Sequence, residues 1–131
     1  MAEATYPDDL LYHAEHDWAR IDPTHPDTAT LGITWYAQDA LGEVVFFDPP
    51  EVGTTITAGE SYAEVESVKA VSDVIAPLSG EIVEVNEALG DSPETINDDP
   101  YGEGWMVRIR LSDPSEKDDL MDQATYTAML E

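Results

Sequence analysis

Residues 63–75 read AEVESVKAVSDVI, and this stretch decides the fold. Apolar and polar side chains alternate from Ala63 to Glu66, and residues 70–75 are rich in valine, so both segments are typical of strands. The connection between them is too short for anything but a tight turn. It lacks the Asn-Gly or Asp-Gly of the primed turns, whereas a type I turn accepts Val68 and Lys69 at its centre. The sequence therefore predicts a hairpin whose tip projects Lys69 into solvent.

Further strands are expected on both sides of this hairpin, which makes the chain mainly β. Thr34 can cap a short helix that runs to Leu41, and Gly42 suits the position after its end. Pro49 and Pro50 end the strand before them, because proline cannot donate to a ladder. Helices are also expected from Ser92-Pro93-Glu94 and from Asp113-Pro114 to the C-terminus. The expected strands lie within 10–22, at 28–33, at 44–47 (buried), at 81–85 and at 105–111, the last with Trp105 on its buried face.

An internal repeat flanks the lysine hairpin. Residues 42–48, GEVVFFD, align with residues 80–86, GEIVEVN, and each copy is followed by an apolar residue and glycine, at 52–53 and 89–90. Two copies of one β unit can cover each other's apolar faces. The repeat therefore favours a quasi-symmetric sandwich or barrel.

Composition limits the class of protein. The 131 residues, 42% hydrophobic, suffice for one domain with a modest core. The chain has no cysteine, which excludes disulfides and thiol catalysis, and no apolar run approaches the roughly 18 residues of a membrane span. The first residues, MAEATYPDD, do not resemble a signal or transit peptide. We therefore expect a protein of the prokaryotic cytoplasm.

The charge is strongly negative, with 29 acidic residues against five basic ones and a net charge of −24. Such a surface disfavours nucleic acid and anionic membranes as partners and favours basic protein faces. Adaptation to salt and steering toward partners both remain open as its cause. Lysine occurs only at Lys69 and Lys117, and Lys117 lies in an exposed polar stretch, so Lys69 is the lysine with an unusual setting.

The residues around Lys69 closely resemble the lipoyl-attachment motif of glycine cleavage system H proteins. Other blocks resemble that family in the same order along the chain, so the resemblance covers nearly all of it. The motif is ESVKAVSD at 66–73, and the other blocks are YHAEHDW at 12–18, LGITWYAQDALG at 31–42, PLSG at 77–80, VNE at 85–87 and PYGEGW at 100–105. Trp35 and a slightly long loop at 23–27 depart from the family pattern, away from the attachment motif.

This resemblance implies a fold and a function. The fold is a biotinyl/lipoyl-type flattened β-barrel, a barrel-sandwich hybrid with short helices, formed by a single carrier domain over residues 1–131. The function is that of a monomeric, non-catalytic carrier that bears lipoate on Lys69. It shuttles an aminomethyl group from a pyridoxal-phosphate glycine decarboxylase to an aminomethyltransferase, after which dihydrolipoamide dehydrogenase reoxidises the dithiol. An alternative is an H-like relay that donates lipoate to other lipoyl domains.

The resemblance also suggests roles for particular residues. Glu66 and Gly80 stand where related lipoyl domains carry the acid and glycine that recur around the lysine read by the lipoate ligase or lipoyltransferase. Asp17 and Asp73 are candidates to hold the ammonium of a loaded arm. His16 is a further candidate arm contact, or a residue that packs locally.

Three other readings are disfavoured. Biotin acceptors usually place methionines beside the lysine, whereas Val68 and Ala70 stand there. The spacing of His13, Glu15 and His16 does not match the His-Glu-x-x-His metal motif, so no metal site is expected. Paired carboxylates could also indicate a hydrolase, but in a chain with 29 acids their proximity is weak evidence.

Overall fold

The computed structural model describes residues 6–130. Residues 1–5 and Glu131 of the expected 1–131 domain, and much of the N-terminal segment that we interpreted as carrying no targeting signal, lie outside this range. The described strands are β1 (Leu11–His13), β2 (Asp17–Ile21), β3 (Thr28–Ile33), β4 (Val44–Asp48), β5 (Thr55–Ile56), β6 (Ser61–Ser67), β7 (Val71–Ile75), β8 (Gly80–Val85) and β9 (Val107–Leu111). The helices are α1 (Trp35–Leu41), α2 (Ala88–Asp91), α3 (Thr95–Asp98), the 3₁₀ helix η1 (Pro114–Asp119) and α4 (Gln123–Leu130).

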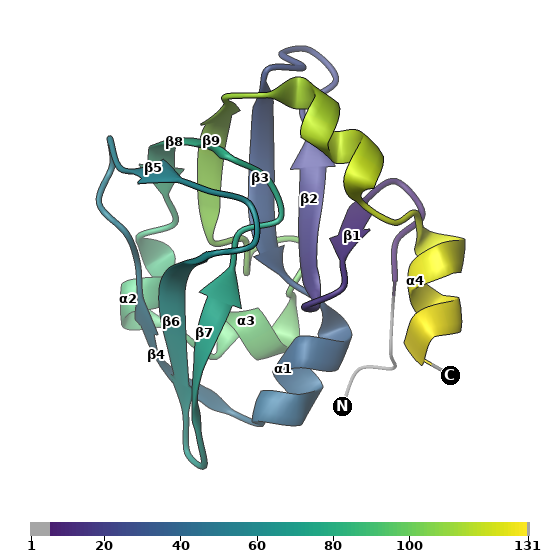
Figure 1. Ribbon diagram of the computed structural model, residues 1–131. Coiled ribbons are helices and arrows are strands. Elements are labelled where there is room, and N and C mark those ends of the chain that lie inside the picture. The colour runs from purple at the N-terminus through teal and green to yellow at the C-terminus, as the bar shows by residue number, and fades with distance from the viewer. Residues whose placement is uncertain (1–5, 131) are drawn as a thin grey trace.

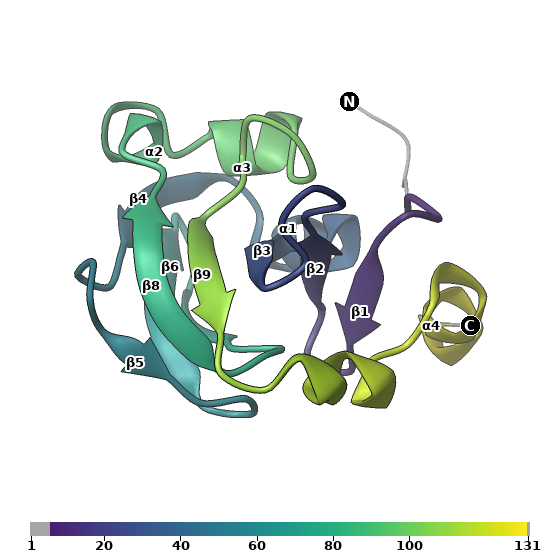
Figure 2. The ribbon, with the colours of Figure 1, turned by 90° about the horizontal axis from the view of Figure 1, so that it is seen from above.

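The strands form two sheets with antiparallel pairing. The larger sheet has the order β1-β2-β3-β9-β8-β5, and the smaller has the order β4-β6-β7. Seen from above, β9, β3, β2 and β1 follow one another across the molecule toward α4 (Figure 2). The two copies of the internal repeat occupy β4 and β8, one in each sheet. Each copy thus contributes apolar side chains to the core from opposite sides, as the repeat predicted.

The main core lies between the sheets. Its fully buried members include Leu31, Val65, Ile82 and Ile109, which come from both sheets. A second cluster of buried aromatics, including Tyr12, Trp18 and Tyr126, packs α4 against the β1 side of the larger sheet. The stacked rings of Tyr12 and Tyr126 have centroids 4.7 Å apart, and such aromatic contacts hold the C-terminal helix in place. Figure 1 shows α4 beside β1.

Helix α1 begins and ends as the sequence predicts. The Thr34 hydroxyl accepts a hydrogen bond from the Ala37 amide, which satisfies a donor left free in the first turn. Gly42 has a φ of 82°, a left-handed conformation that glycine adopts without steric cost, and its amide donates to the Gln38 carbonyl. This geometry turns the chain into β4 beside the β6–β7 hairpin.

Four local predictions need correction. Ser92-Pro93-Glu94 leads into a helix as expected, but α3 begins at Thr95 with Glu94 as its N-cap, so Pro93 lies in the turn before the helix and not at its first position. The C-terminal helix divides into η1 and α4, because Met121 forms a two-way backbone bridge with Tyr12 between them.

The other two corrections concern which residues face the core. Met106 is fully buried and Trp105 is not, because the Trp105 amide closes a turn with Gly102 before β9 begins. In the predicted buried strand at 44–47, only Val44 and Phe47 are buried. A bulge between Val44 and Phe46 leaves Val45 and Phe46 exposed.

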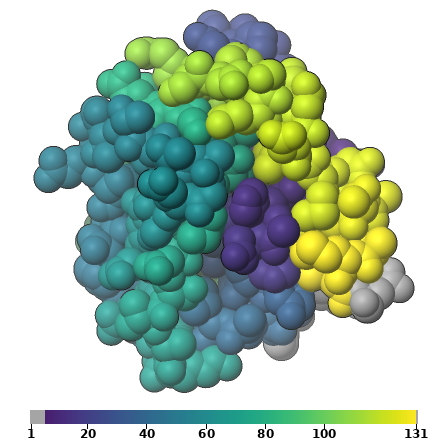
Figure 3. All heavy atoms as spheres, viewed as in Figure 1, coloured from purple at the N-terminus to yellow at the C-terminus, as the bar shows by residue number. Residues whose placement is uncertain are grey.

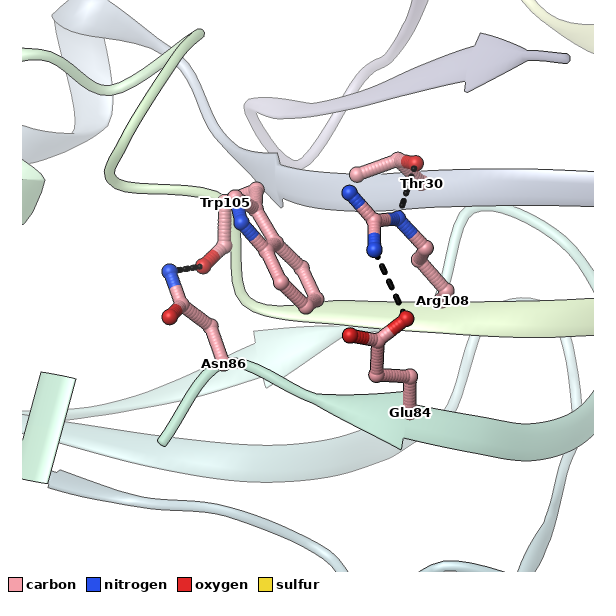
Figure 4. Close-up of polar contacts among 5 residues, drawn as sticks. All are labelled: Thr30, Glu84, Asn86, Trp105 and Arg108. Carbon is pink, nitrogen blue, oxygen red and sulfur yellow. Dashed lines mark hydrogen bonds and ion pairs between the residues drawn. The ribbon is translucent and has the colours of Figure 1, made fainter. Parts of the chain in front are cut away.

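The outer face of the larger sheet carries cross-strand pairs. Arg108 on β9 donates to Thr30 on β3 (3.3 Å) and to Glu84 on β8 (2.7 Å), and its guanidinium stacks 4.2 Å from the centre of the Trp105 ring (Figure 4). The Asn86 side chain donates to the Trp105 carbonyl and holds the indole beside this row. Arg110 pairs with Glu81 at 3.4 Å in the next row of the sheet.

Candidate functional site

The β6–β7 hairpin presents Lys69 at its tip, as predicted. The Ser67 amide donates to the Ala70 carbonyl at 2.7 Å, and the Ser67 hydroxyl accepts from the amides of Lys69 and Ala70. Neither Val68 nor Lys69 has a positive φ, so the turn is not of a primed type. Val68, Lys69 and Ala70 are exposed, and Figure 1 shows the hairpin extending beyond the body of the molecule. The amine on its flexible stem is therefore accessible to an enzyme.

The hairpin is supported from below by the turn that follows α1. The Val68 amide donates to the Glu43 carbonyl at 3.3 Å, and the Lys69 stem lies against Gly42. A Cβ at position 42 would be 3.4 Å from the Lys69 Cε. A Cβ there would thus touch the lysine stem at ordinary contact distance, and glycine is favoured at position 42 by its positive φ.

Asn97 on α3 holds that turn. Its side-chain amide donates to the Gly42 carbonyl (2.8 Å) and to Gln38 (2.9 Å), and its Oδ1 accepts from the Val44 amide (2.8 Å). Sequence reasoning missed both Asn97 and the Ser67 hydroxyl. The Ser67 contact has a local signal, since serine often bonds nearby amides in turns. The Asn97 contacts join residues more than 50 positions apart and have no such signal.

An open groove of about 330 Å³ runs beside the hairpin, between β7, α1 and the β1–β2 turn. Asp17, Asp73 and His16, three residues singled out from the sequence, all line it. Ala70 and Val71, which follow Lys69 directly, also line this groove. The structure thus brings the predicted arm contacts together within reach of the lysine. Sequence reasoning missed two residues in the groove, Tyr36 and Glu15, the latter having been weighed only as a metal ligand.

Asp17 is the unusual member of the groove. Its side chain is 1% exposed, and its Oδ2 is buried without a hydrogen-bond partner among residues 6–130. Burial, and to a smaller extent the charge of Glu15, raises the pKa of Asp17 well above its ordinary value. A buried carboxyl oxygen that lacks a partner, on a residue that lines a groove, calls for a polar group from outside the chain as its partner.

His16 forms part of the wall of the groove. It has a φ of 71°, its Nδ1 lies 2.8 Å from the Tyr126 hydroxyl, and its ring packs 4.3 Å from the Tyr36 ring. The Tyr126 hydroxyl also lies 2.8 Å from the Thr34 hydroxyl that caps α1. Burial lowers the pKa of His16, so the neutral ring is favoured. His16 therefore packs locally, as one alternative predicted, and it also lines the groove.

The other two predicted site residues lie apart from the groove. Glu66 is exposed on the outer face of the smaller sheet, opposite Phe46 and Val71. Gly80 begins β8 in the larger sheet and pairs with Ile56 on β5, at the opposite end of the molecule from the hairpin tip (Figure 1). A Cβ at Gly80 would overlap the Arg110 carbonyl oxygen, so close strand packing requires glycine there.

Comparison with known proteins identifies the family. Residues 10–131 match the family model described as glycine cleavage H-protein. The chain belongs to the glycine cleavage H-protein family. It is 49% identical over 125 residues to the glycine cleavage system H protein of Myxococcus xanthus and 53% identical over 125 residues to that of Escherichia coli O7:K1, in each case over 95% of both chains. The probable H protein of Haloarcula marismortui is 50% identical over 95% of this chain and 96% of its own.

A solved H protein confirms the fold. The crystal structure of the glycine cleavage system H protein from Mycobacterium marinum superposes with a TM-score of 0.86 at 47% identity, over 95% of this chain and 98% of that one. The flattened β-barrel with short helices expected from the resemblance is therefore confirmed. The family match spans all the predicted site residues, from His16 to Gly80.

Residues 6–130 show neither a candidate metal site nor a helix that could span a membrane. Within residues 6–130, no group of three or more His, Asp or Glu side chains is arranged to hold a metal ion. No helix of that part of the chain is long and apolar enough to cross a membrane.

Proposed function

We propose that this chain is a non-catalytic carrier of the glycine cleavage system, one carrier domain over residues 1–131 that bears lipoate in amide linkage on Lys69. The single observation that carries this proposal is the placement of Lys69. The lysine projects from a tight hairpin directly beside a groove that has a buried carboxyl with a free oxygen. Membership of the family supplies the identity of the group, and the exposed amine and adjoining groove fit it.

Attachment requires an enzyme and an activated form of lipoate. A lipoate ligase or lipoyltransferase presents the carboxyl as a mixed anhydride or thioester. The Lys69 amine attacks the carbonyl, the leaving group departs, and the amine loses a proton. Ser67 and the Gly42 turn contribute by holding the hairpin so that the amine stays exposed. The new amide removes the positive charge of Lys69.

The bound dithiolane supplies the sulfur that takes up the aminomethyl group, so no protein nucleophile is needed. In the proposed cycle the partners are a pyridoxal-phosphate glycine decarboxylase, an aminomethyltransferase and dihydrolipoamide dehydrogenase. The carrier meets them as a cytoplasmic monomer. Its negative charge favours basic faces on all three.

The groove is proposed to protect a loaded arm. Asp73 at its exposed edge and Asp17 within it can both meet the terminal ammonium, with His16 beside them. An ammonium in the groove favours the ionised form of Asp17, which burial alone disfavours. A charge-assisted hydrogen bond would then satisfy the free Oδ2.

The carrier role is tested by intact mass with peptide mapping on protein from its own host. One lipoyl group on Lys69, absent in Lys69→Ala and retained in Lys117→Ala, is the expected result. An unmodified chain from cells whose other lipoyl domains are loaded would contradict the proposal. Supplying the loaded protein with decarboxylase and glycine then separates the glycine cleavage role from the lipoyl relay. Only the first role gives an aminomethyl adduct.

The groove is tested by the rate at which the loaded group is lost to water as formaldehyde and ammonia. Asp73→Asn and Asp17→Asn are expected to raise this rate several-fold. Asp48→Asn is the matched control, because Asp48 is exposed on the same sheet but does not line the groove. A rate that is unchanged by either groove variant removes that residue from the proposal.

A further inference from the structure

The outer face of the smaller sheet carries a row of three exposed side chains, two of them apolar, next to the Lys69 hairpin. Phe46 on β4 pairs with Glu66 on β6, which pairs with Val71 on β7, so the three side chains stand in one row on one face. All three are exposed, Phe46 at 54% and Val71 at 62%. We name these three residues the Phe46 strip. The hairpin that it adjoins forms the lower edge of the molecule in Figure 3.

The register shows that this exposure is built into the fold. Val44 opposite Ser67, and Phe47 opposite Val65, are buried in the rows on either side of the strip. The bulge at Val45 shifts β4 by one residue and aims the Phe46 ring outward. A phenylalanine that is 54% exposed leaves about half of its apolar surface in water, and a partner surface can bury that part.

Every charged side chain on the three strands of this sheet is acidic, and Lys69 stands beside them in the hairpin. The next outward row joins Asp48, Glu64 and Asp73, and all three are exposed. Strands β4, β6 and β7 contain no Lys, Arg or His. Both ion pairs found within residues 6–130 lie on the other sheet. The strip therefore presents two apolar side chains on either side of Glu66, next to an acidic row that forms no ion pair within residues 6–130.

The length of the lysine stem indicates which enzyme must touch this face. Before loading, the amine is only four carbons from the backbone, so the enzyme that acylates it has to contact the hairpin and its base. Enzymes that act later meet the far end of a longer arm and can work at a greater distance. A complementary surface beside Lys69 therefore serves the loading step first of all.

We propose that the Phe46 strip is the docking surface for the lipoate-attaching enzyme, which offers an apolar hollow to Phe46 and Val71 and basic side chains to the acidic flank. This inference rests on the proposed function, because it requires that Lys69 be loaded. It assigns to Phe46 and Val71 a role in recognition, alongside the role that the sequence suggests for Glu66.

The test is the rate of Lys69 loading by a purified lipoate ligase with lipoate and ATP, followed by intact mass. Phe46→Ala is expected to lower kcat/KM about tenfold and Val71→Ser about threefold, mainly through KM. Val52→Ser and Met129→Ala are matched controls, since Val52 is 63% exposed and Met129 43% exposed outside this sheet. The controls should load within about twofold of the unaltered chain. Because the three valine and methionine changes are at exposed sites, their thermal unfolding midpoints should stay close together.

Three results would overturn part or all of this picture. Equal loading of Phe46→Ala, Val71→Ser and the controls would overturn the docking surface and leave the carrier role intact. Failure of the unaltered chain to load on Lys69 would instead overturn the proposed function on which it rests. A dimer of the unaltered chain that Phe46→Ala converts to a monomer, with no change in loading, would assign the strip to a second copy of this chain.

Discussion

On the outer face of the six-stranded sheet, arginine and glutamate meet across neighbouring strands, whereas the strands of the three-stranded sheet show carboxylates and apolar side chains but no cation. Arg108 and Arg110, with their glutamates, are thus satisfied within the fold. The side chains around Phe46 leave charge and apolar area for something else to cover. In a chain of net charge −24, two of the five basic side chains, Arg108 and Arg110, thus neutralise glutamates on one face. The strands beside Lys69 keep their carboxylates unpaired, which makes that face complementary to a basic partner.

Charge-reversal variants on the two sheets should distinguish the two faces most clearly. Glu66→Lys is expected to lower ligase loading of Lys69 about a hundredfold, because like charges at a docking face repel, and to change stability little. Glu84→Lys removes the Arg108 pair and should leave loading within about twofold. Loading kinetics beside urea unfolding measure both effects. Similar loading by the two variants would mean that the faces do not differ in this respect.

Asp17, whose carboxyl is buried in the larger sheet, should give the next largest effect, a change in stability with pH. Burial raises the pKa of Asp17 in the folded chain, so the native state holds more protons than the unfolded state and the free energy of unfolding falls as the pH rises. Asp17→Asn should therefore be more stable at pH 8 by more than about 1 kcal/mol. The gap should close toward about pH 4, where the unfolded carboxyl also protonates. Urea unfolding across this range measures the gap, and a constant gap would contradict the buried neutral acid.

Removing either arginine of the larger sheet should cause a smaller loss of stability. Arg108→Ala removes the Glu84 pair, the Thr30 hydrogen bond and the stack on Trp105, and we expect a cost of about 1 kcal/mol. Arg110→Ala removes a longer, more exposed pair and should cost no more than about 0.5 kcal/mol. Equal losses in chemical denaturation would show that the extra contacts of Arg108 contribute nothing.

The smallest effect has the opposite sign. Asp48, Glu64 and Asp73 stand directly opposite one another across three strands, and like charges in such a row repel. Glu64→Gln should raise the free energy of unfolding by a few tenths of a kcal/mol, roughly 0.3, at low salt. The gain should vanish near 1 M salt, where the screening length is about 3 Å. A loss of stability at low salt would mean that the row is compensated in solution.

The local elements were predictable because their causes lie close together in the chain. Alternation set the β6–β7 hairpin, and Thr34 and Gly42 set the ends of α1. The predictions failed where distant contacts prevailed over local pattern. The bridge between Tyr12 and Met121 divides the C-terminal helix, and a bulge against β6 turns Phe46 outward from a strand expected to be buried.

The sequence by itself determined that the chain is mainly β, that Lys69 stands on a tight hairpin, and which family the chain resembles. These follow from side-chain periodicity and from residues adjacent in the chain. Only the tertiary structure decided that Asp17, Asp73 and His16 share one groove, that Asn97 holds the turn beneath Lys69, and that Gly80 is required by strand packing far from the hairpin. The reason is physical: burial, strand register and long-range hydrogen bonds depend on which segments meet, and no local pattern records that.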